Sequence, residues 1–179
     1  MNDITNDYDK LRAMKACASA LQWIGDCTIE QAWSECERSD WMCWLLRKIA
    51  PNDQRCRLTA ADFAERVWHL IPDEPTKLAA AWAIGAARRG DRDEMDAAYA
   101  TAAYAATYAT AASYAATYAA NSATAYATAY AYAAYAANSA GYACASAYDA
   151  AAERAKQADI LRQYFSAREV GDLFSQAPA

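Results

Sequence analysis

The chain has 179 residues, of which 56% are hydrophobic and 22% are charged, and its formal net charge is -5. This length fits one domain. An acidic chain without a run of Lys or Arg is a poor nucleic-acid binder, because neutralising phosphates requires clustered cations. Residues 1–10 are polar and acidic and lack the apolar core of a signal peptide. We therefore expect a cytoplasmic protein whose six Cys are free, mostly buried thiols.

Few Gly and Pro residues favour helices, and the first half of the chain predicts a series of short amphipathic ones. Apolar residues at steps of three and four predict a helix from Asp9 to Ile24, which Gly25 ends. Thr28 and Gln31 have the spacing of a capping box that opens the next helix. The expected inner face of that helix consists of Ile29, Ala32, Trp33 and Cys36.

Three more helices are predicted before residue 91 from capping and helix-breaking residues. Asp40 is the expected cap of the first, which Pro51 closes. Thr59 is expected to open the second, because an acidic residue follows it three positions later. The third covers residues 75–89 and stops at Gly90.

An uncharged run follows, over residues 97–148, in which Ala is the dominant residue and Tyr, Thr, Ser and Asn supply most of the rest. Ala has the highest helix propensity, and the run contains no Pro, so helices are predicted. The absence of Leu, Ile, Val and Phe argues against a membrane span. We expect two or three close-packed helices, with breaks near Asn121 and Asn138, although one long rod is the alternative.

Polar residues recur in this run with an eleven-residue period, which forms one stripe on a nearly straight helix. The stripe consists of Thr110, Ser113, Thr117, Asn121, Thr124 and Thr128. It is either a product of the composition or an ice-binding face, since the run is similar to the Ala- and Thr-rich helical antifreeze proteins of fish. Two further hypotheses are a Tyr-lined sponge for nucleotide-type ligands and a self-assembling helical scaffold.

The last segment predicts an amphipathic helix over residues 151–165, with Glu153 outward and Leu161 and Phe165 inward, and a short helix over 167–174. This C-terminal part is expected to close the bundle against the first half. The predicted fold is therefore all-α, a bundle of short amphipathic helices followed by long Ala-rich ones. Its three parts in one domain are residues 1–90, 91–150 and 151–179.

Catalytic and metal-binding patterns are weak in this sequence. His69 is the single His, and its apolar neighbours favour a structural role over that of a general base. The Cys residues lack the close spacing of structural zinc sites. We expect no enzymatic activity, no cofactor and no metal site, with the Cys side chains acting as small buried hydrophobes. The Cys residues concerned are Cys17, Cys27, Cys36, Cys43 and Cys56.

The most distinctive stretch covers residues 36–46, where two Trp three positions apart share a helix face next to a charged turn. One interpretation places both Trp in the core, with Asp40 as a helix cap. The other is a partner-binding edge, since Trp and Arg are over-represented among the residues that anchor protein interfaces. The candidate binding residues are Glu37, Arg38, Asp40, Trp41 and Trp44.

The pattern between Met14 and Pro51 is most specific in Arg38-Ser39-Asp40-Trp41-Met42 and Trp44-Leu45. Its other positions are Ala16-Cys17, Ala20-Leu21, Trp23, Gly25, Ala32-Trp33 and Cys36. In this pattern the stretch resembles a family of immunity proteins found in bacterial toxin–immunity loci and tailed-phage genomes, although the family usually has Gly at position 39. The Ala-rich half is similar to that family in style only.

The resemblance implies a small non-enzymatic binding protein that neutralises another macromolecule, as an immunity protein or a phage-encoded inhibitor. It also implies a protein partner, either a toxin or a host defence factor, met in the host cytoplasm if the protein is phage-encoded. The net negative charge favours a basic partner, because electrostatic steering requires opposite sign. The uncharged surface of the Ala-rich run is compatible with homo-oligomers.

Overall fold

The computed structural model describes residues 4–51, 53–68, 74–90 and 150–178, and every regular element in these ranges is an α-helix. The predicted all-α class is confirmed for this part of the chain. The Ala-rich run with its polar stripe, and His69, lie outside the described residues. The helices are α1 (Ile4–Ala13), α2 (Ala18–Ile24), α3 (Ile29–Glu35), α4 (Ser39–Ile49), α5 (Arg55–Val67), α6 (Glu74–Arg89), α10 (Ala150–Tyr164) and α11 (Ala167–Gln176).

Several helix ends lie where local signals predict them. The Thr28 hydroxyl oxygen accepts from the backbone N–H of Gln31 at 3.3 Å, and the Gln31 side chain accepts from the N–H of Thr28 at 3.0 Å. This confirms the capping box that opens α3. Gly25 ends α2 with a φ of 50°, and Gly90 follows α6 with a φ of 76°. Glycine adopts this left-handed conformation without the steric cost that other residues incur.

The prediction of one continuous helix from Asp9 to Ile24 is wrong, because two helices, α1 and α2, cover this stretch. The chain leaves α1 after Ala13, and Lys15 takes a φ of 67°, a conformation that a residue with a Cβ rarely adopts. The N–H of Ala16 then bonds back to the carbonyl of Leu11 at 3.0 Å, so the chain turns before α2 begins. Apolar spacing continues through this turn, which is why periodicity alone predicted one helix.

Two predicted helix starts are also wrong. Asp40 lies inside the first turn of α4 and does not cap it, because its carboxylate is engaged by Arg38. Thr59 lies within α5, where its buried hydroxyl donates to the carbonyl of Cys56 at 2.9 Å. A Thr or Asp does not mark the start of a helix when its side chain forms a hydrogen bond within the helix or with a neighbouring side chain.

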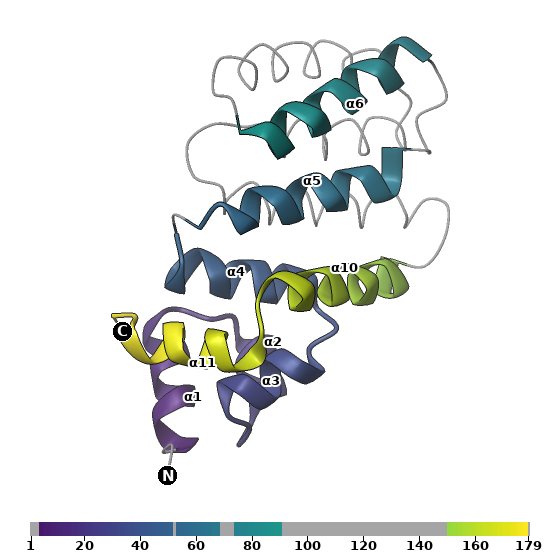
Figure 1. The fold of residues 1–179 in the computed structure, drawn as a ribbon. Coiled ribbons are helices and arrows are strands. Elements are labelled where there is room, and N and C mark those ends of the chain that lie inside the picture. Colours follow the sequence, from purple (N-terminus) through teal and green to yellow (C-terminus); the bar gives the residue numbers. More distant parts are fainter. Residues whose placement is uncertain (1–3, 52, 69–73, 91–149, 179) are drawn as a thin grey trace.

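The helices are arranged in successive layers, with α6 on α5, α10 against both α4 and α5, and α11 packed on α3 (Figure 1). The C-terminal pair therefore closes against the first half, as predicted. Each of the described helices contributes to one buried cluster of side chains, in which Phe63, Leu161 and Phe165 are fully buried. Burying such side chains is the main favourable term that holds α10 and α11 in place.

A buried polar chain fixes the register of α10. The Ser39 hydroxyl, at the start of α4, donates to the side-chain oxygen of Gln157 at 2.8 Å. The Gln157 amide donates to Glu153 at 3.3 Å, and Glu153 accepts two hydrogen bonds from Arg66 of α5 at 2.7 and 2.9 Å. Glu153 is 6% exposed, so its predicted outward position is wrong. Arg66 provides the charge that makes this burial tolerable.

Cations from other helices donate to carbonyls at the C-termini of several of the described helices. Lys10 donates to the last carbonyls of α11, and Arg57 donates to those of α6. Arg162 of α10 donates to the carbonyls of Trp33 and Cys36 at the end of α3. These contacts satisfy groups that a helix leaves without partners and complement its negative end. Arg162 thereby anchors the turn that leads into α4.

Candidate functional site

A hollow on the surface lies where α2 meets the first turns of α4, and we name it the tryptophan groove. Its volume is about 460 Å³. It combines two aromatic side chains with charged ones and a thiol, so it is suited to contacts of mixed polarity. The tryptophan groove is lined by Lys15, Cys17, Ala20, Arg38, Asp40, Trp41 and Trp44.

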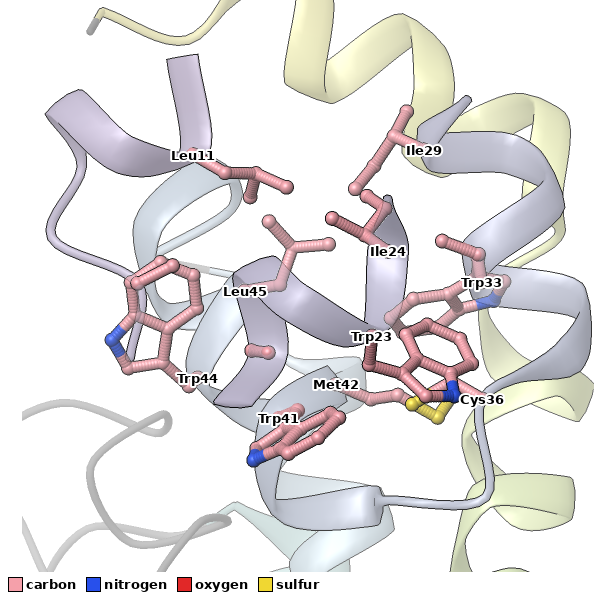
Figure 2. A pocket seen from close by; sticks show the side chains of 13 residues that line it. Leu11, Trp23, Ile24, Ile29, Trp33, Cys36, Trp41, Met42, Trp44 and Leu45 are labelled. Carbon is pink, nitrogen blue, oxygen red and sulfur yellow. The ribbon is translucent and has the colours of Figure 1, made fainter. Parts of the chain in front are cut away.

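Next to the groove lies an apolar pocket that shares Ala20, Trp41 and Trp44 with it. Figure 2 shows this pocket, with Trp41 and Trp44 reaching it from α4 and Trp23 from α2. Its volume is about 60 Å³. Pockets that enclose a drug-sized ligand measure about 300–1,000 Å³, so this one has room only for the tip of a side chain.

Three side chains contact one another in series and form what we call the stack, two of them from the groove lining and the third from the adjoining apolar pocket. The guanidinium of Arg38 lies 4.4 Å from the centre of the Trp41 ring, in a cation–π contact. The Trp41 ring in turn contacts Trp23 at a centroid distance of 6.0 Å and an interplanar angle of 59°. Trp23 is 44% exposed, although it is one of the largest apolar side chains. The stack therefore holds a rigid aromatic surface in contact with solvent.

Asp40 fixes the orientation of Arg38 through two parallel hydrogen bonds of 2.9 and 2.7 Å. Burial of Asp40 acts to raise its pKa, but the hydrogen bonds and the positive charge of Arg38 outweigh it and leave the pKa below its usual value. The carboxylate is thus ionised at neutral pH. This planar, two-bond arrangement keeps the guanidinium over the Trp41 ring.

The turn before α4 is positioned by buried groups. The Cys36 thiol donates to the carbonyl of Arg38 at 3.6 Å and accepts from its N–H at 3.4 Å. Burial raises the pKa of Cys36, so the thiol keeps the proton that it donates. From behind, Ser39 is bonded to Gln157 of α10, and Arg162 binds the Cys36 carbonyl. The C-terminal helices therefore support the groove although they do not line it.

Four of the five predicted binding residues meet in the tryptophan groove: Arg38, Asp40, Trp41 and Trp44. Glu37 is exposed and does not line it. Trp41 and Trp44 are half-buried, so each has one side in the core and one side open. The core interpretation therefore holds for one side of each Trp, and the partner-binding interpretation stays a prediction for the open side. The role of Asp40 as a helix cap does not hold.

The prediction missed the residues that α2 and the preceding turn bring here, namely Lys15, Cys17 and Ala20 in the groove and Trp23 in the adjoining apolar pocket. One signal could have found Trp23, because it lies off the apolar face that was predicted for its helix, and an off-face Trp indicates exposure. The others depend on the positive φ at Lys15, which the sequence does not signal.

The other predicted features concern metal binding, the cysteines and membrane spans, and the described part of the chain bears on each of them. No group of three or more His, Cys, Asp or Glu is placed there to hold a metal ion. Cys36, Cys43 and Cys56 are buried as expected, but Cys17 is exposed, which contradicts its predicted burial. None of the helices described combines the length and apolar character needed to cross a membrane.

Comparison with known proteins gives no relative to guide the interpretation: no family model, no curated protein and no solved structure matches this chain. The resemblance of residues 14–51 to immunity proteins therefore stays a prediction. So do the ice-binding, nucleotide-binding and scaffold hypotheses, which depend on residues outside the described ranges. The geometry of the tryptophan groove is the observation on which a function can be argued.

Proposed function

We propose that this protein is a small, non-enzymatic helical binding protein that neutralises a partner protein by docking it on the tryptophan groove. The observation that carries the proposal is the exposed stack of Trp23, Trp41 and Arg38. Trp and Arg are the side chains most often found at the energetic centre of protein interfaces. A stack that is already ordered loses little conformational entropy when a partner binds.

The small apolar pocket and the exposed aromatic surface beside it favour a protein partner. The pocket, at about 60 Å³, cannot enclose a ligand, and the neighbouring Trp23 side chain is 44% exposed. A protruding side chain of a partner can instead enter the pocket while its neighbours lie along Trp41 and Trp44. The resemblance of residues 14–51 to immunity proteins supports the same function, with the cytoplasm as the compartment.

The proposal is tested by affinity capture with the full chain and matched variants. Wild-type protein, Trp23→Ala, Trp41→Ala and Trp68→Ala are immobilised and exposed to the same bacterial lysate, after circular dichroism has shown that each is folded. Trp68 is the control, because it is 38% exposed and lies at the end of α5, outside the groove. We expect a partner that is captured by the wild type and by Trp68→Ala.

The same partner should be lost from both groove variants, because each removes part of the aromatic surface. Capture that persists in Trp23→Ala and Trp41→Ala would show that the groove is not the binding site. Failure of the folded wild-type protein to retain any specific protein would contradict the binding function itself.

A further inference from the structure

The charges that border the tryptophan groove are mostly positive, in contrast to the chain as a whole. Lys15 and Arg38 line it, and the Lys48 ammonium lies 5.9 Å from the centre of the Trp44 ring. Asp40 is the single acidic residue among the described residues of the lining, and it is occupied by its two hydrogen bonds to Arg38. Elsewhere the acidic residues exceed the basic ones, which gives the formal net charge of -5.

Two of these cations are available to a partner. No ion pair of Lys15 or Lys48 is found among the described residues, and both side chains are exposed. At physiological ionic strength, charges are screened over about 8 Å, so a bound segment responds to the cations beside it more than to the net charge of the protein. The local charge therefore decides which segment the groove accepts.

We infer that the tryptophan groove takes an acidic segment of a partner protein, in which Asp or Glu residues flank an apolar side chain. The apolar side chain would lie on Trp41 and Trp44, with its tip at the small apolar pocket that these residues also line, and the carboxylates would reach Lys15 and Lys48. This inference rests on the proposed function and specifies its partner. It also differs from the prediction made from the net charge of the chain, which favours a basic partner.

The test is selection from a random-peptide display library on the full chain, with sequencing of the peptides that are retained. We expect the pool to be enriched in peptides that carry Asp or Glu next to Leu, Ile, Phe or Trp. Binding of a selected peptide should weaken by about tenfold in the double variant Lys15→Glu/Lys48→Glu, since two attractive contacts become repulsive. It should also weaken as salt is added.

Two variants serve as controls. Lys156→Glu reverses an exposed charge on α10, outside the groove lining, and should leave the affinity unchanged. Trp41→Ala removes the aromatic surface and should abolish retention of the pool. Charge reversal changes only exposed side chains, so it keeps the inference testable even if Trp41→Ala does not fold.

The outcomes separate the inference from the proposed function. If the selected peptides are basic or uncharged and do not bind Trp41→Ala, the groove is the binding site, but the inference of an acidic segment is overturned. If the selected peptides bind Trp41→Ala and the charge-reversal variant as well as they bind the wild type, the inference and the proposed function are both overturned. If the chain self-associates in sedimentation experiments and Trp41→Ala abolishes this, a second copy occupies the groove and the acidic segment is again overturned.

Discussion

Replacing Trp23 by Ala tests whether the aromatic stack is a surface or part of the core. A buried Trp→Ala change costs about 3–5 kcal/mol, but Trp23 is 44% exposed, so roughly half of that area term applies. The contact with Trp41 contributes about 0.5–1.5 kcal/mol and is lost as well. We therefore expect a decrease in the free energy of unfolding of about 3 kcal/mol, measured by urea denaturation followed by circular dichroism.

The matched comparison is Trp33→Ala. Trp33 is 2% exposed, and its indole N–H donates to the carbonyl of Phe165 at 2.9 Å, so truncation leaves both a cavity and an unpaired carbonyl. Its expected cost is about 4 kcal/mol or more. The reasoning is refuted if Trp23→Ala is as destabilising as Trp33→Ala, because Trp23 would then be a core residue with no surface to offer.

Three further substitutions test the contacts that position the groove. Arg66→Met should cost about 3 kcal/mol of unfolding free energy, because it leaves Glu153 buried without its cation. Ser39→Ala should cost about 2 kcal/mol, because Gln157 loses its buried donor. Asp40→Asn should be more destabilising at about pH 6 than at about pH 3, since the lowered pKa of Asp40 stabilises the fold only while the carboxylate is charged.

Each of these has a control with the same chemistry, in which the substituted side chain or its partner is exposed. Lys77→Met breaks an ion pair in which Glu74 is 78% exposed, and it should cost less than about 0.5 kcal/mol. Ser34→Ala removes a hydroxyl that bonds its own helix, and Asp26→Asn removes an exposed carboxylate. The assigned contacts would be contradicted if a substitution and its control lowered the free energy of unfolding equally. They would also be contradicted if the destabilisation by Asp40→Asn increased as pH falls.

Local signals predicted the ends of helices well where one side chain decides them. The capping box of Thr28 and the two glycines at positions 25 and 90 are of this kind, because their hydrogen bonds and backbone angles depend on near neighbours in the sequence. The amphipathic pattern of residues 151–165 likewise predicted α10 and the burial of Leu161 within it and of Phe165 just after it.

Contacts between distant segments were not predictable in the same way. The burial of Glu153 depends on Arg66, which lies 87 positions earlier, and a charged residue on a helix is normally assigned to solvent. The break at Lys15 depends on how α2 packs, since the apolar spacing runs through it. Because this break brings Ala20 and Trp23 to α4, the sequence predicted one wall of the groove and missed the other.

The central claim, that the tryptophan groove binds the partner, is tested most directly by the indole N–H signals of the ¹⁵N-labelled full chain. The six Trp give one such signal each. On titration with a selected peptide, the signals of Trp23, Trp41 and Trp44 should shift, while those of buried Trp33 and of Trp68 at the end of α5 should not. A shift confined to Trp68, with the three groove signals unchanged, would contradict the claim.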